Sequence, residues 1–141
     1  MSNSLIFATT TSAASVLANG VIPLINISRR RGCASTLASN SITLNAPGYY
    51  KITGTVTFTA PVAGDVTIEA RKNGTAIPGI TASTTITTAT TEVRSIAVSG
   101  IVRVFCNEGV ASLTLVNSGV AIDISNVSLD VEYLGWTIWI F

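Results

Sequence analysis

The chain has 141 residues, of which 48% are hydrophobic and 11% are charged, and its net charge at pH 7 is +1. This hydrophobic content excludes a disordered chain, and the charge balance excludes the basic surface that nucleic-acid binding requires. No apolar stretch approaches the roughly 18 residues of a membrane-spanning helix, so no membrane partner is expected either. The length predicts one domain. Typical soluble domains have about 25% charged residues, so the low charged fraction of this chain is typical of a surface partly covered by other subunits.

Residues 1–20 are rich in Thr, Ser and Ala and predict an irregular arm or a short helix. Such an arm either attaches the domain to another protein or is a frayed terminus. No Lys or Arg precedes its short apolar run, which argues against a secretory signal and favours assembly in the cytoplasm.

A strand is predicted over residues 21–27, at a sheet edge because Pro23 cannot donate to a central ladder. The only dense charge in the chain follows it, as Arg29, Arg30 and Arg31. This cluster is either a clamp for carboxylate or phosphate groups on a partner, or a solvated turn.

A longer strand follows the turn at Pro47-Gly48 and alternates with a period of two. Its apolar face carries Tyr50, Ile52, Val56, Phe58 and Ala60. Threonines line its other face. Gly54 on the apolar face favours a curved sheet packed against a second sheet.

A hairpin is predicted around Asn73-Gly74, because both residues tolerate positive φ. The strand before it alternates over residues 66–71. The strand after it is expected to end at Pro78-Gly79, followed by a weakly defined Thr-rich strand and a loop.

The second long strand covers residues 92–105, and both of its faces are largely apolar. Since one face of an antiparallel sheet is usually solvated, we expect another subunit to cover the second face. Shorter strands are predicted over residues 111–115 and 120–124, and Asn126 separates the latter from a last core strand that ends near Tyr133.

The apolar tail after Gly135 contains both tryptophans of the chain. Exposed, it would promote aggregation, so it either folds back onto its own core or is buried against other chains, and we favour the latter. The residues expected at partner interfaces are Arg29, Arg30, Arg31, Phe105, Tyr133, Trp136, Ile138, Trp139, Ile140 and Phe141.

The chain has no His, which removes Ser-His-Asp and Cys-His catalysis and the commonest metal ligand. Cys33 and Cys106 are too far apart for a local zinc knuckle, and form either a disulfide or two buried free thiols. Asp130 and Glu132, two apart on a strand, are more typical of a solvated face than of a glycosidase. We therefore expect no enzymatic activity, no metal and no cofactor.

About ten short strands, separated by Gly, Pro and Asn turns, predict an all-β sandwich or barrel. Their order resembles the trimeric jelly roll of the C1q/TNF type, found at the ends of bacterial collagen-like proteins and in phage structural proteins. The resemblance rests on residues 21–24, 41–50, 66–77, 111–117 and 127–134.

This resemblance implies an antiparallel two-sheet jelly-roll sandwich over residues 21–134, between an arm (1–20) and an apolar tail (135–141). It also implies a homotrimer packed around a threefold axis, which would cover the apolar second face of residues 92–105. No Gly-X-Y repeat precedes the domain, so a collagen stalk is not expected.

Our first functional hypothesis is a structural protein of a bacteriophage virion: a decoration protein, a head fibre or a tail appendage. Its partners would be its own copies and capsid or tail proteins. The alternative is a receptor- or carbohydrate-binding tip, in which Tyr49, Tyr133, Trp136 and Trp139 stack on a host-surface glycan. A third possibility is an exosporium-type bacterial surface protein.

Overall fold

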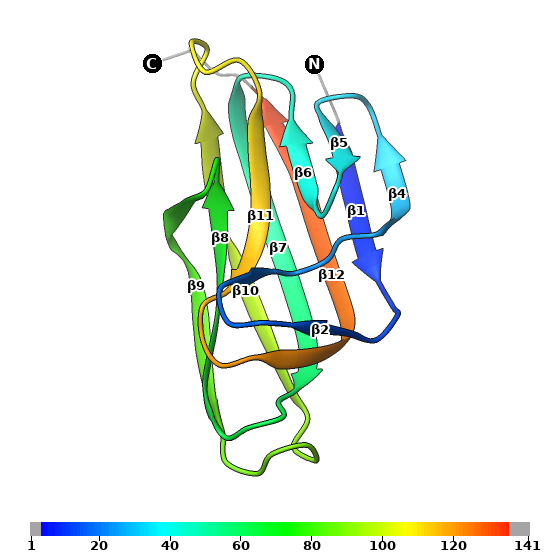
Figure 1. Cartoon of the computed structure of the whole chain (residues 1–141). Coiled ribbons are helices and arrows are strands. Elements are labelled where there is room, and N and C mark those ends of the chain that lie inside the picture. The colour runs from blue at the N-terminus through cyan, green and yellow to red at the C-terminus, as the bar shows by residue number, and fades with distance from the viewer. Residues whose placement is uncertain (1–3, 136–141) are drawn as a thin grey trace.

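The computed structural model describes residues 4–135, which form twelve strands in two antiparallel sheets packed face to face (Figure 1). The β7 sheet has the order β10-β7-β12-β1-β4, and β2 is added beside β12. The β11 sheet has the order β5-β6-β11-β8-β9, and β3 is added beside β11. No helix in the described range is long and apolar enough to cross a membrane.

The strands of the β7 sheet are β1 (Leu5–Thr10), β2 (Ala14–Val16), β4 (Asn26–Arg31), β7 (Gly48–Thr59), β10 (Arg94–Val104) and β12 (Ile122–Gly135). Those of the β11 sheet are β3 (Gly20–Val21), β5 (Ser35–Ala38), β6 (Ser41–Leu44), β8 (Gly64–Lys72), β9 (Thr75–Ile86) and β11 (Ala111–Asn117).

The core lies between the sheets and follows the period-two pattern of the sequence. On β7, Tyr50, Ile52 and Phe58 are fully buried, as the alternation predicts. Gly54 is also buried, and a Cβ there would lie 3.5 Å from Leu115 of the opposite sheet and 3.2 Å from Leu129. The glycine therefore lets the two sheets approach closely at the centre of the sandwich.

The N-terminal twenty residues differ from the irregular arm or short helix that the sequence predicts. Residues 5–10 form β1, an internal strand that pairs with β12 on one side and β4 on the other. Ile6, Ala8 and Thr10 point into the core and are fully buried. The sandwich therefore begins at Leu5 rather than near residue 21, because this alternating segment completes a sheet.

The strand expected over residues 21–27 is split between the two sheets. β3 ends at Val21 and β4 begins at Asn26, and the chain crosses from one sheet to the other between them. The Thr10 hydroxyl donates to the Pro23 carbonyl at 2.7 Å and accepts from the Ile25 N–H at 3.2 Å, which holds this crossing in place.

The hairpin at Asn73-Gly74 is confirmed, with φ of 53° and 85° joining β8 to β9. β9 does not end at Pro78-Gly79 but continues to Ile86, because β9 is an edge strand and tolerates a proline. Asn126 likewise does not end a strand: β12 continues through it with a shift in register against β7.

The two cysteines are free thiols and both are exposed, so the expected alternatives of a disulfide and of buried thiols are both wrong. Cys33 lies in the turn that follows β4, and Cys106 lies in the turn that follows β10.

Candidate partner-binding surfaces

The three arginines of β4 lie on an open sheet edge. All six residues of this strand are exposed, and it forms the outer edge of the β7 sheet, at the right of the view in Figure 1. Arg31 lies beside Leu5 and Arg29 beside Phe7 of β1, and within residues 4–135 no strand pairs with the other side of β4. An open edge presents unpaired backbone groups to which another extended chain can bind.

These arginines also lack acidic partners within the part of the chain that the structure describes. The ion pairs there join Arg71 to Glu69, Lys72 to Glu108 and Arg94 to Glu92. None of these pairs involves β4, so its positive charge faces solvent. Guanidinium groups bind carboxylates and phosphates in two-pronged geometry, which makes this edge suited to an anionic partner.

A second surface is a cluster of cations and aromatic rings at the end of β10, which we call the β10-end cluster: Tyr49, Lys72, Arg103, Phe105 and Glu108. The Arg103 guanidinium lies 4.4 Å from the centre of the Phe105 ring and 5.4 Å from that of Tyr49. The Lys72 ammonium lies 5.3 Å from the Phe105 ring. Cations at this distance are attracted by the ring faces, which holds the exposed Phe105 in position.

Glu108 fixes the turn that carries Phe105. Its carboxylate accepts the Phe105 N–H at 2.7 Å and the Lys72 ammonium at 3.0 Å. The backbone hydrogen bond from Phe105, followed by the one from Lys72, lowers the pKa of Glu108 below its ordinary value. Phe105 is thus presented at the surface, 44% exposed, by a hydrogen-bonded turn.

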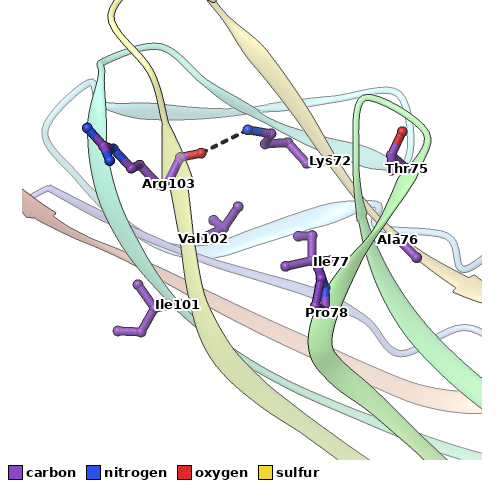
Figure 2. Close-up of a pocket in the computed structure, with 8 residues that line it drawn as sticks. All are labelled: Lys72, Thr75, Ala76, Ile77, Pro78, Ile101, Val102 and Arg103. Atoms are coloured by element: carbon purple, nitrogen blue, oxygen red, sulfur yellow. Dashed lines mark hydrogen bonds between the residues drawn. The ribbon is translucent and has the colours of Figure 1, made fainter.

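A hollow of about 200 Å³ opens beside this cluster, between the start of β9 and the end of β10 (Figure 2). Its apolar walls come from Ile77, Pro78 and Ile101, while Lys72 and Arg103 stand at its rim. The Lys72 ammonium donates to the Arg103 carbonyl at 2.9 Å, the dashed line in Figure 2.

Tyr133 lies at the same end of the sandwich but is packed inward. Its ring centre is 5.0 Å from that of Tyr50, and its hydroxyl donates to the Pro47 carbonyl at 2.6 Å. Burial raises the pKa of Tyr133. Within this chain, Tyr133 closes the end of the core.

The outer face of the β7 sheet, which points away from the β11 sheet, carries mixed charged and apolar side chains. One row across its strands consists of Ile101, Lys51, Glu132, Leu5 and Arg31. Asp130 lies in the next row, beside Phe7. Burial, and then the neighbouring negative charge of Glu132, raise the pKa of Asp130. On β10, the large apolar residue of this outer face is Ile101, which is 53% exposed.

Comparison with solved structures identifies this architecture. The structure matches murine APRIL with a TM-score of 0.67 and 11% identity, over 94% of this chain and 100% of that one. The globular domain of the zebrafish complement 1qA protein matches with a TM-score of 0.68 and 4% identity, over 95% and 99% of the two chains. The chain has a TNF/C1q-like jelly-roll fold.

The same jelly roll is present in vertex protein P5 of PRD1, which matches with a TM-score of 0.61 and 16% identity, over 94% of this chain and 97% of that one. No protein-family model and no curated protein matches the sequence. The predicted C1q/TNF-type fold is therefore confirmed.

The jelly roll separates the interface residues that the sequence predicts. Arg29–Arg31 and Phe105 lie at opposite edges of the β7 sheet, four strand spacings or about 19 Å apart. Phe105 and Tyr133 share one end of the sandwich. Trp136, Ile138, Trp139, Ile140 and Phe141 lie outside the described residues.

Sequence reasoning missed the cluster that Arg103 forms with Tyr49 and Lys72. The available signal was Arg103 itself, a charge among the apolar residues at positions 101–105. Its pairing with Tyr49 depends on the register of β10 against β7, which joins residues more than fifty positions apart.

Proposed function

We propose that this protein is a non-enzymatic structural component of a bacteriophage virion that assembles as a homotrimer. The observation that carries the proposal is the likeness to the phage vertex protein P5 of PRD1 over nearly the whole of both chains. The protein would be a decoration protein, a head fibre or a tail appendage, with the jelly roll as its structural domain. The particle would be assembled in the host cytoplasm.

The apolar side chains on the outer face of the β7 sheet support the homotrimer. The resemblance to C1q/TNF-type domains implies threefold packing, and this face bears apolar side chains such as Ile101 and Phe7 among its charges. If a neighbouring subunit covers these side chains, the trimer is stabilised by about 25 cal/mol for each Å² of apolar surface removed from water. It would also account for the scarce charge of the sequence.

Light scattering on the purified chain at micromolar concentration tests the trimer. We expect a mass of about 44 kDa, three times the 14.6 kDa of one chain. Thr55→Arg, in the centre of the outer face of β7, should reduce the mass to that of a monomer. Thr43→Arg on β6, on the outer face of the opposite sheet, is the matched control and should leave the trimer intact. A monomeric wild type would contradict the proposal.

The open β4 edge supports attachment to another virion protein. Its three arginines are exposed and unpaired by acids in the described part of the chain, and its backbone edge is free. The double change Arg29→Glu and Arg31→Glu should abolish rebinding to virions that lack the protein, and light scattering on the same variant shows whether the trimer persists. Arg71→Glu, a cation on β8 of the opposite sheet, is the control.

A virion role is tested directly by mass spectrometry of purified phage particles from cells that carry the gene. We expect the protein to co-purify with the particles at a constant ratio to the capsid protein. Its absence from the particles, with the gene located away from phage structural genes, would favour a bacterial surface protein instead.

The carbohydrate-binding alternative depends on exposed aromatic rings. Tyr133 is engaged with Tyr50 and Pro47 and is not free to stack on a sugar, whereas Tyr49 is half-buried beside Arg103. A glycan array separates the two functions: reproducible binding that Tyr49→Ala removes would favour the receptor-binding tip.

A further inference from the structure

β4 differs from the other strands that end the two sheets. The end strands are β4 and β10 in one sheet, and β5 and β9 in the other. β9 and β10 pack against each other, so that side of the sandwich is closed (Figure 1). β5 has only four residues, none of them charged. Within residues 4–135, β4 is therefore the end strand that is both open and charged.

The backbone of β4 is held in its extended form by the chain itself. At the end of the strand, the buried Ser4 hydroxyl donates to the Arg31 carbonyl at 3.0 Å and accepts the Ala34 N–H at 2.9 Å. At its start, the Ser28 hydroxyl lies 2.9 Å from that of Thr9. A preformed edge binds an added strand at a lower cost in conformational entropy than a mobile segment would. This favours an extended polypeptide that pairs with β4 through backbone hydrogen bonds.

The side chains of β4 determine which strand fits beside it. Arg30 pairs with the buried Ile6 of β1, so its side chain leaves the strand on the side of the core. Arg29 and Arg31 leave it on the other side. Ile27, 42% exposed, is the apolar residue of the strand. Residues that lie opposite each other across two strands share a face, and opposite charges there are stabilising. Three consecutive acidic residues on a partner strand would therefore match the three arginines.

The same charges disfavour a second copy of this chain at the edge. Two antiparallel β4 strands centred on each other would place Arg30 opposite Arg30, and Arg29 opposite Arg31. Like charges directly opposite each other are destabilising, and such charges keep sheets from joining edge to edge. An acidic strand turns this repulsion into attraction, so the edge selects its partner by charge.

We propose that β4 binds an extended acidic segment of another protein, which joins the β7 sheet as a further antiparallel strand. Three consecutive Asp or Glu residues of the segment lie opposite Arg29–Arg31. The inference rests on the attachment to another virion protein proposed above, and it names the chemistry of the attaching segment. The backbone pairing lies in the plane of the sheet, so it leaves the outer face of the β7 sheet open to a neighbouring subunit.

Calorimetric titration of the full-length protein with a synthetic peptide tests the proposal. The probe is acetyl-Thr-Glu-Glu-Glu-Thr-Val-Thr-amide, and its control has Gln in place of each Glu. We expect only the acidic peptide to bind and to slow amide hydrogen exchange over residues 26–31.

Variants of the protein test the role of the arginines. Arg29→Gln with Arg30→Gln should weaken binding of the acidic peptide about tenfold, the equivalent of two cross-strand charge pairs. Arg71→Gln with Arg94→Gln removes the same charge from ion pairs elsewhere and should change the affinity less than about twofold, because distant surface charges are screened. Circular dichroism checks that both variants are folded. An equal loss of affinity in the two variants would overturn the proposal.

N-methylation of the peptide separates strand pairing from a general attraction between charges. Alternate amides of an added strand face β4, and the others face solvent. Methyl groups on one alternate set should therefore abolish binding, whereas methyl groups on the other set should preserve it. Equal effects of the two sets would overturn strand addition. Binding of a ten-nucleotide oligothymidylate as tight as that of the peptide would also overturn it, in favour of a nucleic acid.

Failure of this proposal is distinguishable from failure of the virion role. If the protein co-purifies with phage particles but the acidic peptide does not bind, the virion role stands and the acidic strand is ruled out. If the peptide binds as expected but the protein is absent from particles, the β4 edge takes its acidic strand from a partner outside the virion. Aggregation of the arginine variant, without peptide binding to the wild type, would mean that the arginines only protect the edge.

Discussion

Gly100 of β10 lies directly against Ile80 of β9, although the two strands belong to different sheets. A Cβ atom on Gly100 would stand 2.5 Å from the Ile80 Cγ1 atom, far inside normal contact. Ile80 is 1% exposed, so it has no space into which to move. The bare backbone at Gly100 is therefore what lets the two sheets meet along this edge, next to the hollow.

Gly100→Ala should destabilise the fold by about 1–3 kcal/mol, the usual cost of overfilling a packed core. Urea denaturation measures the loss. Ser99→Ala, at the exposed neighbouring position, is the control and should change stability by less than about 0.5 kcal/mol. In an Ile80→Ala background the same glycine change should cost less, because the clashing atoms are gone. An equal cost in both backgrounds would contradict the steric explanation.

Tyr50→Phe should destabilise the fold by about 1–3 kcal/mol, because it removes a buried hydroxyl from its hydrogen bonds. The Tyr50 hydroxyl donates to the Ala46 carbonyl at 2.6 Å and accepts the Ala46 N–H at 3.1 Å. Burial raises the pKa of this phenol. Thermal unfolding of Tyr50→Phe and of the control Tyr49→Phe measures the difference, and equal melting temperatures would contradict this role.

The long alternating strands were predictable because period two is a local signal. Tyr50, Ile52 and Phe58 are buried as expected, and the Asn73-Gly74 turn joins two strands as expected. The jelly-roll fold itself followed from the order of such segments, together with the family resemblance.

The strands at the N-terminus were not predictable in the same way. β1 is an internal strand only because Leu5 pairs with Glu132, at the other end of the chain. A solvated turn was one interpretation of the three arginines, because three adjacent charges rarely occur in a central strand. They lie in a strand because β4 is at the edge of its sheet, where charged side chains are common. The β10-end cluster draws its members from three strands and the turn after β10, so no window of the sequence reveals it.

Glu92 should stabilise the protein at neutral pH and lose that effect in acid. Its carboxylate accepts the Thr88 N–H at 2.9 Å, which, with bonds from Thr87 and Arg94, lowers its pKa from 4.5 to about 2. Because the folded state binds this proton less tightly than the unfolded state, the stabilisation is present above pH 4.5 and disappears as the pH falls towards 2.

Glu92→Gln should therefore lower the free energy of unfolding at pH 7, and its curve should converge with that of the wild type in acid. Chemical denaturation at a series of pH values measures both curves. A constant difference across the whole series would show that the carboxylate charge is not responsible.

Asp130→Asn should have the opposite effect to Glu92→Gln and raise the free energy of unfolding at pH 7. Burial, and then the charge of Glu132, raise the pKa of Asp130, so the folded state binds its proton more tightly than the unfolded state. The ionised carboxylate therefore costs stability at neutral pH. The gain from the variant should fade as the pH falls through the raised pKa towards the ordinary value, since the wild-type group is then protonated in both states.

Denaturation of Asp130→Asn and of Asp123→Asn across the same pH series separates this effect from a general loss of negative charge. Asp123 lies on the same strand but is exposed and accepts a hydrogen bond from Ser15 at 2.8 Å, so its replacement should bring no gain. If both variants gain equally, net charge rather than the half-buried Asp130–Glu132 pair limits stability. If Asp130→Asn loses stability at pH 7, its ionised form is favoured in the folded chain and the assigned sign is wrong.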